Sequence, residues 1–178
     1  MAYRMHAKKL GFLLSMALVA AAILATRIQE VAVPIWHRFA DTNRVNPLTL
    51  HLQGEFVESN LGIAREPDGS FTLRMIAEQY MFVPHCVLVP AGTPVHLRIT
   101  SADVVHSLTF SGTDYGVKVA PGVVSQATLR FSQQAEYPAP CREFCGAGHF
   151  AMRSRLRVIP KEQFPVLSPD KRGNCASR

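Results

Sequence analysis

The stretch from residue 141 to residue 152 constrains the fold most, because it crowds soft metal ligands into a few positions. It reads CREFCGAGHFAM and contains two cysteines, one histidine and one methionine. Thiolate and thioether sulfur select copper, zinc or iron–sulfur clusters, and methionine is not among the usual ligands of zinc. Two thiolates in one loop can bridge two metal ions, and Gly146 and Gly148 let the backbone turn sharply between ligands. The stretch therefore predicts a loop that holds two copper ions.

Each copper ion also needs a nitrogen ligand. His149 supplies one, and we expect the second at the end of a nearby strand. His106 is the best candidate, since a polar turn there leads into an apolar run. The remaining histidines fit less well: His6, His37 and His51 precede the predicted strands, and His85 and His96 are expected to be surface or packing residues.

The four cysteines leave an alternative open. Cys141 and Cys145 could form a disulfide in an oxidising compartment, but that pairing gives no reason for the histidine and methionine that follow. Cys86 lies in a candidate core strand and Cys175 lies in the polar tail. Those two could also pair, but we expect Cys86 to be buried and Cys175 to be free.

From Phe71 onward, short apolar runs alternate with turn residues at about ten-residue spacing, which is typical of an antiparallel sandwich or barrel. In the last run Met152, Leu156 and Val158 share one face, and arginines occupy the other. The methionine sulfur should therefore point inward. We expect strands at residues 71–79, 84–90, 94–100, 105–111, 115–119, 123–132 and 152–159. The simplest architecture is an all-β sandwich whose last two strands are joined by the ligand-bearing loop.

The amino terminus predicts export. Residues 10–26 carry no charge and no proline, and three basic residues precede them. Their length favours a retained transmembrane helix over residues 10–27, with a cleaved signal peptide as the alternative. The positive-inside rule then places residues 1–9 in the cytoplasm and the rest of the chain on the outer, periplasmic face of the membrane.

The remaining organisation follows from this anchor and from the strand pattern. Residues 28–70 are expected to be a linker and lead-in with few clear elements, residues 71–160 the folded domain, and residues 161–178 a polar tail. The formal net charge of +6 is modest, and no run of basic and aromatic residues marks a nucleic-acid groove. We therefore expect no nucleic-acid partner.

At the ligand-bearing residues the chain resembles the copper-A domain of cytochrome c oxidase subunit II, from the haem–copper oxidases. The loop of that family reads C-x-E-x-C-x3-H-x2-M, which the chain matches from Cys141 to Met152. Its upstream histidine falls in a D-V-x-H segment, which Asp103 to His106 match, and residues 116–122 resemble its intervening segment. The resemblance covers residues 71–160. The single anchor is similar to the compact B-type branch.

The resemblance implies a cupredoxin-like Greek-key fold and a binuclear copper-A centre. The implied copper ligands are His106, Cys141, the backbone carbonyl of Glu143, Cys145, His149 and Met152. In many members of the family the carboxylate at the position of Glu143 binds magnesium at the contact with subunit I. The usual tryptophan-rich electron entry is absent here, so Tyr80, Phe82 or the edge of a histidine ligand is expected to serve.

The implied function is electron input to a terminal oxidase. Cytochrome c or another small periplasmic donor would supply electrons, and haem in subunit I would receive them and reduce oxygen. The chain would thus be one subunit of an oxidoreductase, held in membrane lipid. The alternatives are a copper chaperone or storage protein, and the copper-A subunit of a nitric oxide reductase.

Overall fold

The computed structural model describes residues 15–24, 43–165 and 172–175 of the chain. The chain divides into two units, residues 1–40 and residues 41–178. Residues 15–24 of the first unit are helical and exposed. No helix within the described ranges combines the length and apolar character that a membrane crossing requires. The predicted anchor over residues 10–27 lies partly outside the described residues, and the predicted cytoplasmic segment 1–9 lies wholly outside them.

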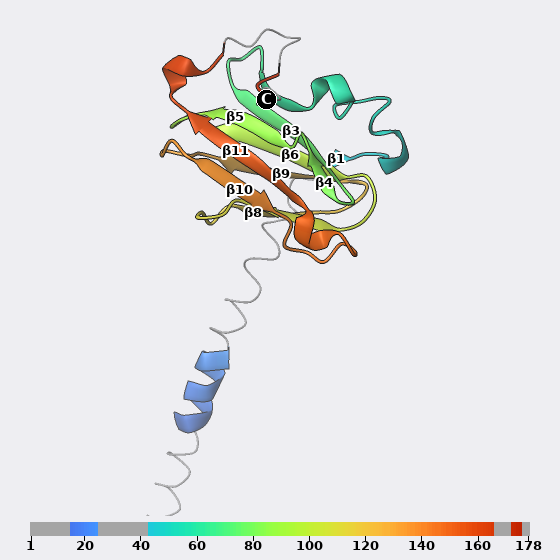
Figure 1. The fold of residues 1–178 in the computed structure, drawn as a ribbon. Coiled ribbons are helices and arrows are strands. Elements are labelled where there is room, and N and C mark those ends of the chain that lie inside the picture. Colours follow the sequence, from blue (N-terminus) through green and yellow to red (C-terminus); the bar gives the residue numbers. More distant parts are fainter. Residues whose placement is uncertain (1–14, 25–42, 166–171, 176–178) are drawn as a thin grey trace, which may run out of the picture. The chain divides into compact units, whose positions relative to one another are not determined.

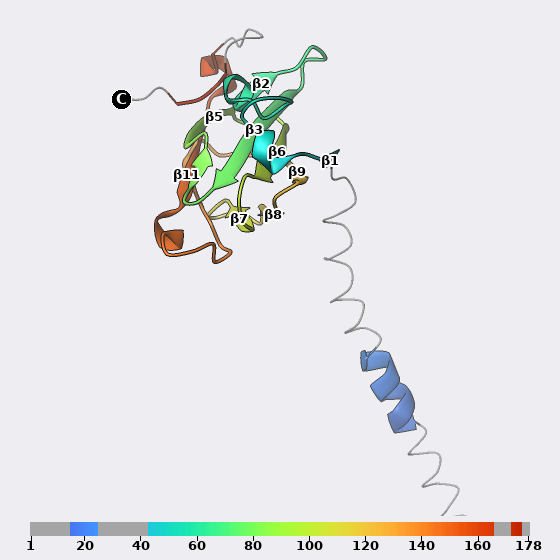
Figure 2. The same ribbon diagram turned by 90° about the vertical axis from the view of Figure 1, so that its right-hand side faces the viewer.

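The second unit is built from two facing β layers (Figures 1 and 2). In the first layer the strands lie in the order β1-β9-β6-β3-β2, and β4 pairs with β3. Strands β3 and β6 run parallel, and every other pair in this layer is antiparallel. The strands are β1 (Asn43–Arg44), β2 (Gly62–Arg65), β3 (Phe71–Glu78), β4 (Met81–Val83), β6 (Val95–Ser101) and β9 (Val123–Leu129).

The second layer has the order β10-β11-β5, and the hairpin β7-β8 lies beside it. An isolated bridge between Leu108 and Cys141 joins β7 to the end of β10. The strands are β5 (Cys86–Pro90), β7 (His106–Thr109), β8 (Gly116–Val119), β10 (Glu136–Pro140) and β11 (Arg153–Ile159). The second unit also contains short 3-10 turns at η1 (Pro47–Thr49), η2 (Glu58–Asn60), η3 (His149–Ala151) and η4 (Lys161–Gln163).

The core lies between the two layers and follows the alternation of the sequence. Along β11, buried residues alternate strictly with exposed arginines, so the predicted parity of this strand is confirmed. The buried cluster takes Leu73 and Leu97 from one layer and Val87 and Leu156 from the other. Burying each such side chain contributes about 1.5–3 kcal/mol. The domain is therefore the expected all-β, cupredoxin-like sandwich.

The lead-in differs from the expectation that it holds few clear elements. Strand β2 extends the main sheet, and β1 pairs with β9 at its other edge. Between these strands Leu50, Phe56 and Leu61 pack on Ile76 and Val124 in a second buried cluster. Polar turns separate these apolar residues, so they show no regular hydrophobic period from which a helix or strand could be predicted.

The carboxyl-terminal residues 172–175, which we call the C-terminal strap, are fixed to the sandwich. Cys175 forms a disulfide with Cys86, so the expectation that Cys175 is free is wrong. The backbone N–H of Leu88 on β5 donates to Gly173, and the N–H of Gly173 donates to Ile63 on β2. The strap thus joins an edge strand of each layer. Sequence reasoning missed this pairing because the two cysteines are 89 residues apart with no pattern linking them.

The predicted strands that correspond to β3 and to β5 through β9 are confirmed to within a few residues, as is the last strand, β11. Strand β10 was missed because Pro138 and Pro140 interrupt its pattern, and proline is depleted in strands. Both prolines serve as acceptors here: their carbonyls accept bonds from the Ser111 N–H and the Thr109 hydroxyl. The ligand-bearing loop therefore joins β10, and not the 123–132 strand, to β11.

Candidate metal centre

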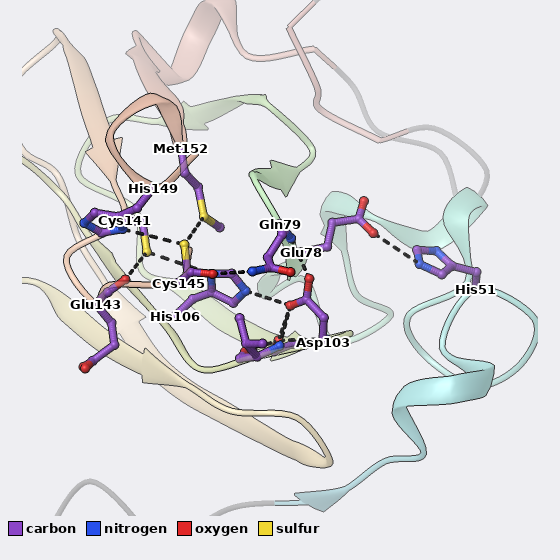
Figure 3. Close-up of polar contacts among 12 residues, drawn as sticks. His51, Glu78, Gln79, Asp103, His106, Cys141, Glu143, Cys145, His149 and Met152 are labelled. Atoms are coloured by element: carbon purple, nitrogen blue, oxygen red, sulfur yellow. Dashed lines mark hydrogen bonds and ion pairs between the residues drawn. The ribbon is translucent and has the colours of Figure 1, made fainter. Parts of the chain in front are cut away.

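The register of three strands brings distant ligands together at one end of the sandwich. The Leu108–Cys141 bridge, and a bond from the Arg142 N–H to the Ser107 carbonyl, set the end of β10 beside β7. His106 is the first residue of β7, so its ring reaches the first cysteine of the loop. Figure 3 shows the side chains of the predicted ligands converging on one small volume: His106, Cys141, Cys145, His149 and Met152.

The contacts fall into two groups, one around each cysteine. The Cys141 sulfur lies 3.9 Å from Nδ1 of His106. The Cys145 sulfur lies 3.6 Å from Nδ1 of His149 and 3.6 Å from the Met152 sulfur. The ligand atoms of His106, Cys141 and Cys145 all lie within 4.8 Å of one another. The predicted residues are therefore brought together from two separate segments of the chain.

Most of the centre is shielded from water, and His149 is partly buried. His106 has no exposed surface, and Cys141, Cys145 and Met152 are buried. Burial, together with the neighbouring Cys141 thiol, raises the pKa of Cys145 to about 11. Cys141 and Cys145 are not joined to each other in the structure, and both are free thiols.

Asp103 contacts the His106 ring on the side opposite the Cys141 sulfur. Its carboxylate lies 2.8 Å from Nε2 of His106, which directs Nδ1 toward the sulfur. Partial burial works to raise the pKa of Asp103, but bonds from His106 and from the N–H groups of Gln79 and Val104 hold it below its ordinary value. A carboxylate behind a ligating histidine fixes the tautomer and the orientation of the ring.

Glu143 presents two different groups. Its backbone carbonyl lies 3.2 Å from the Cys141 sulfur, on the inner side of the loop. Its half-exposed carboxylate points outward and lies 3.4 Å from the Lys118 ammonium. The carbonyl is therefore placed where a weak copper ligand is predicted, and the carboxylate is open to solvent.

Exposed apolar side chains surround the loop. Phe144 is 73% exposed and Phe150 is 88% exposed, and their rings lie 5.8 Å and 5.3 Å from the His149 ring. Tyr80, at the turn between β3 and β4, is 37% exposed. Phe82 is fully buried and packs edge-on against the His106 ring, so a partner protein cannot touch it. His85 and His96 are exposed, in agreement with the prediction for them.

The sequence did not predict Gln79 as part of this centre, and it gave Asp103 no role beyond its place in the D-V-x-H segment. Gln79 is 66 residues from Cys145 in the sequence, yet its side-chain amide donates to the Cys145 carbonyl. Its backbone N–H donates to Asp103 across 2.6 Å. No local pattern announces such a residue. Asp103 could have been found, because a carboxylate is a common hydrogen-bond partner for the second ring nitrogen of a ligating histidine.

The residues fit copper. Ligand atoms that share one metal ion at roughly 2.0–2.3 Å lie about 3.5 Å apart in a tetrahedral arrangement. The sulfur–nitrogen and sulfur–sulfur separations of 3.6–3.9 Å are close to that value. Thiolate, imidazole and thioether together favour copper over zinc.

A cupredoxin-like sandwich whose last loop places two cysteines, a histidine and a methionine beside a histidine of β7 defines a copper protein of the cupredoxin class. Residues 70–159 match the family "Cytochrome C oxidase subunit II, periplasmic domain". The chain is 31% identical over 115 residues to cytochrome c oxidase subunit 2 of Thermus thermophilus, covering 65% of this chain and 85% of the relative. A second protein of the same description and species is 30% identical over 115 residues, covering 65% of this chain and 68% of the relative.

A solved structure extends the likeness to nearly the whole chain. It is a chain of a haem–copper terminal oxidase dimer, with 25% identity and a TM-score of 0.54, covering 86% of this chain and 99% of that one. The present chain therefore belongs to the cytochrome c oxidase subunit II family, and its folded unit is the periplasmic domain of that family. The matches favour the oxidase subunit over the chaperone and nitric oxide reductase alternatives.

Proposed function

We propose that this chain is the electron-input subunit of a terminal haem–copper oxidase and holds a binuclear copper-A centre. His106, Cys141, Cys145, His149, Met152 and the Glu143 carbonyl would hold the two ions. One observation carries the proposal: two buried thiols lie side by side, and each faces a different imidazole nitrogen at less than 4 Å. A mononuclear blue-copper site would use only one of these thiols, whereas two thiols that each lie beside an imidazole would provide donors for two copper ions.

A copper pair held by these residues would supply one-electron transfer with the charge shared between two metals. The chain's own residues prepare the site for it. Asp103 keeps Nδ1 of His106 turned toward the sulfurs, so that this ligand does not reorient when the charge changes. The burial of the cysteines and Met152 excludes water, which would otherwise reorganise with each electron.

A relay needs one contact surface for the donor and another for the acceptor, and exposed apolar side chains lie both at the β3–β4 turn and on the loop. We propose that the donor, cytochrome c or another small periplasmic protein, docks beside Tyr80 and its exposed neighbour Met81. We propose that Phe144 and Phe150, which flank His149, face the haem-containing subunit I. The outward carboxylate of Glu143, next to Phe144, would hold magnesium at that contact.

We also propose the membrane arrangement predicted from the amino terminus. Residues 10–27 would cross the lipid bilayer once, with residues 1–9 in the cytoplasm. The copper domain would then lie on the periplasmic face, where its electron donor is found. Proteolysis of sealed vesicles tests this orientation. Residues 1–9 should be cleaved only in vesicles that expose the cytoplasmic face, and the copper domain only in vesicles that expose the periplasmic face.

The test of the copper centre uses the full chain purified in detergent and loaded with copper under reducing conditions. We expect two copper ions per chain, a purple colour after partial oxidation, and an electron-spin signal split by two copper nuclei. Reduction of this form by a periplasmic cytochrome c should be rapid. A colourless protein with one copper ion per chain would overturn the proposal and support a metal-delivery role.

A further inference from the structure

The turn between β3 and β4 contacts both halves of the predicted copper centre. One half is His106 with its partner Asp103, and the other is the loop that carries the two cysteines. The turn consists of Gln79 and Tyr80, and neither is a predicted metal ligand. Figure 3 shows Gln79 lying between Asp103 and Cys145.

Gln79 makes one bond to each half. Its backbone N–H donates to Oδ2 of Asp103 at 2.6 Å, while Oδ1 of the same carboxylate lies 2.8 Å from His106. Its side-chain Nε2 donates to the backbone carbonyl of Cys145. A continuous chain of hydrogen bonds therefore runs from the imidazole of one ligand to the backbone of another.

Tyr80 fixes the distance between the turn and the loop. A Cβ atom at Gly146 would lie 2.5 Å from the Tyr80 hydroxyl oxygen and 2.8 Å from the Gln79 amide nitrogen. A Cβ atom at Gly148 would lie 2.4 Å from the Tyr80 ring. Real side chains do not approach so closely, so both loop positions require glycine for the turn to reach the loop backbone.

We propose that Gln79 is a positioning residue that sets the spacing between the His106 side and the cysteine side of the copper centre. The proposal rests on the function proposed above. Its physical basis is that the Cys145 carbonyl needs a donor, and the amide of Gln79 supplies it from the neighbouring turn. Without this amide the Cys145 segment of the loop loses its link to Asp103, and its spacing from His106 is held less tightly. Loss of such outer partners typically costs about 10–100-fold in metal affinity.

The test compares Gln79→Met with the wild-type full chain and with Gln133→Met, which changes an exposed glutamine away from the centre. Gln79→Glu serves as a second variant, since it keeps the shape of the side chain but presents an acceptor to the carbonyl. We measure the rate of copper loss to a chelator, the electron-spin spectrum of the loaded chain, and the unfolding temperature of the metal-free chain.

We expect both Gln79 variants to lose copper on the order of tenfold faster, with altered copper hyperfine splitting and an unfolding temperature equal to that of Gln133→Met. Unchanged copper loss and spectrum in both variants would overturn the proposal. A matching fall in metal-free stability would also overturn it, because Gln79 would then be a general support of the fold. If the wild-type chain itself fails to bind two copper ions, the proposed function fails instead.

Discussion

The backbone N–H of Cys141 donates to the carbonyl of Met152 across 3.0 Å, so the first and last ligands of the loop are neighbours on adjacent strands. This bond closes the loop at the point where β10 and β11 leave the sheet. Of the ten residues between them, Arg142 bonds to Ser107 on β7, and the other nine, which include Cys145 and His149, belong to no strand. The sheet therefore fixes one end of the copper centre, and the loop must be held by other contacts.

Replacing Met152 with leucine should change the electronic properties of the centre with little effect on folding. Met152 is buried, and leucine has a similar volume, so the free energy of unfolding should fall by less than about 1.5 kcal/mol. The thioether is a weak donor that helps to set the reduction potential, and its loss should raise that potential. Redox titration of the loaded chain measures the shift. Leu156→Met, further along the same buried face of β11, is the control for packing alone, and an equal potential shift there would contradict the assignment.

Replacing Gly148 with alanine should displace the loop through a single contact. The backbone of Gly148 has φ −88°, which alanine adopts freely, so the cost comes only from its Cβ meeting the Tyr80 ring at 2.4 Å. We expect a loss of about 1–3 kcal/mol in the free energy of unfolding, as for other overpacked sites, together with weaker copper binding.

The double-mutant cycle with Tyr80→Ala isolates this contact. In the Tyr80→Ala chain the alanine at position 148 should be nearly harmless, because the ring that it meets is gone. Denaturant unfolding and copper titration of all four chains measure the coupling. Additive effects of the two substitutions would show that the loop does not rest on Tyr80.

Contacts within one loop or strand follow local sequence patterns, whereas contacts between distant segments do not. The clustering of Cys141, Cys145, His149 and Met152 could be predicted because their spacing within one loop and the alternation of β11 are local patterns. Gln79 acts on Cys145 from 66 residues away, and Cys86 pairs with Cys175 from 89 residues away. Such contacts depend on which edges of the sheets meet. Strand β10 was not predicted for another reason: its two prolines interrupt the residue pattern that is typical of a strand.

Removing the Cys86–Cys175 disulfide should weaken the fold and leave the copper centre intact. The bond closes a loop of 89 residues, and a loop of that length is expected to contribute roughly 2–5 kcal/mol by limiting the unfolded chain. The double substitution Cys86→Ala and Cys175→Ala should lower the unfolding midpoint in denaturant by a corresponding amount. The copper content and spectrum should not change, since neither sulfur lies among the predicted ligands. A loss of copper in this variant would mean that the C-terminal strap supports the metal loop as well as the sheet edges.

Replacing Phe150 with serine should slow electron transfer to the oxidase partner without altering the centre. The ring is 88% exposed, so its removal costs little folding energy, and it lies against His149, which is a predicted ligand. An exposed aromatic beside a ligand buries its area only when a partner covers it, and such anchors commonly contribute about 1–4 kcal/mol to binding. In the assembled oxidase, flash-initiated transfer from this chain to haem should slow, while reduction by the periplasmic donor stays at the wild-type rate. Leu48→Ser, an equally exposed apolar residue on η1, is the matched control. If the donor reaction slows and the transfer to haem does not, then Phe150 belongs to the entry face, and the assignment of the two faces must be reversed.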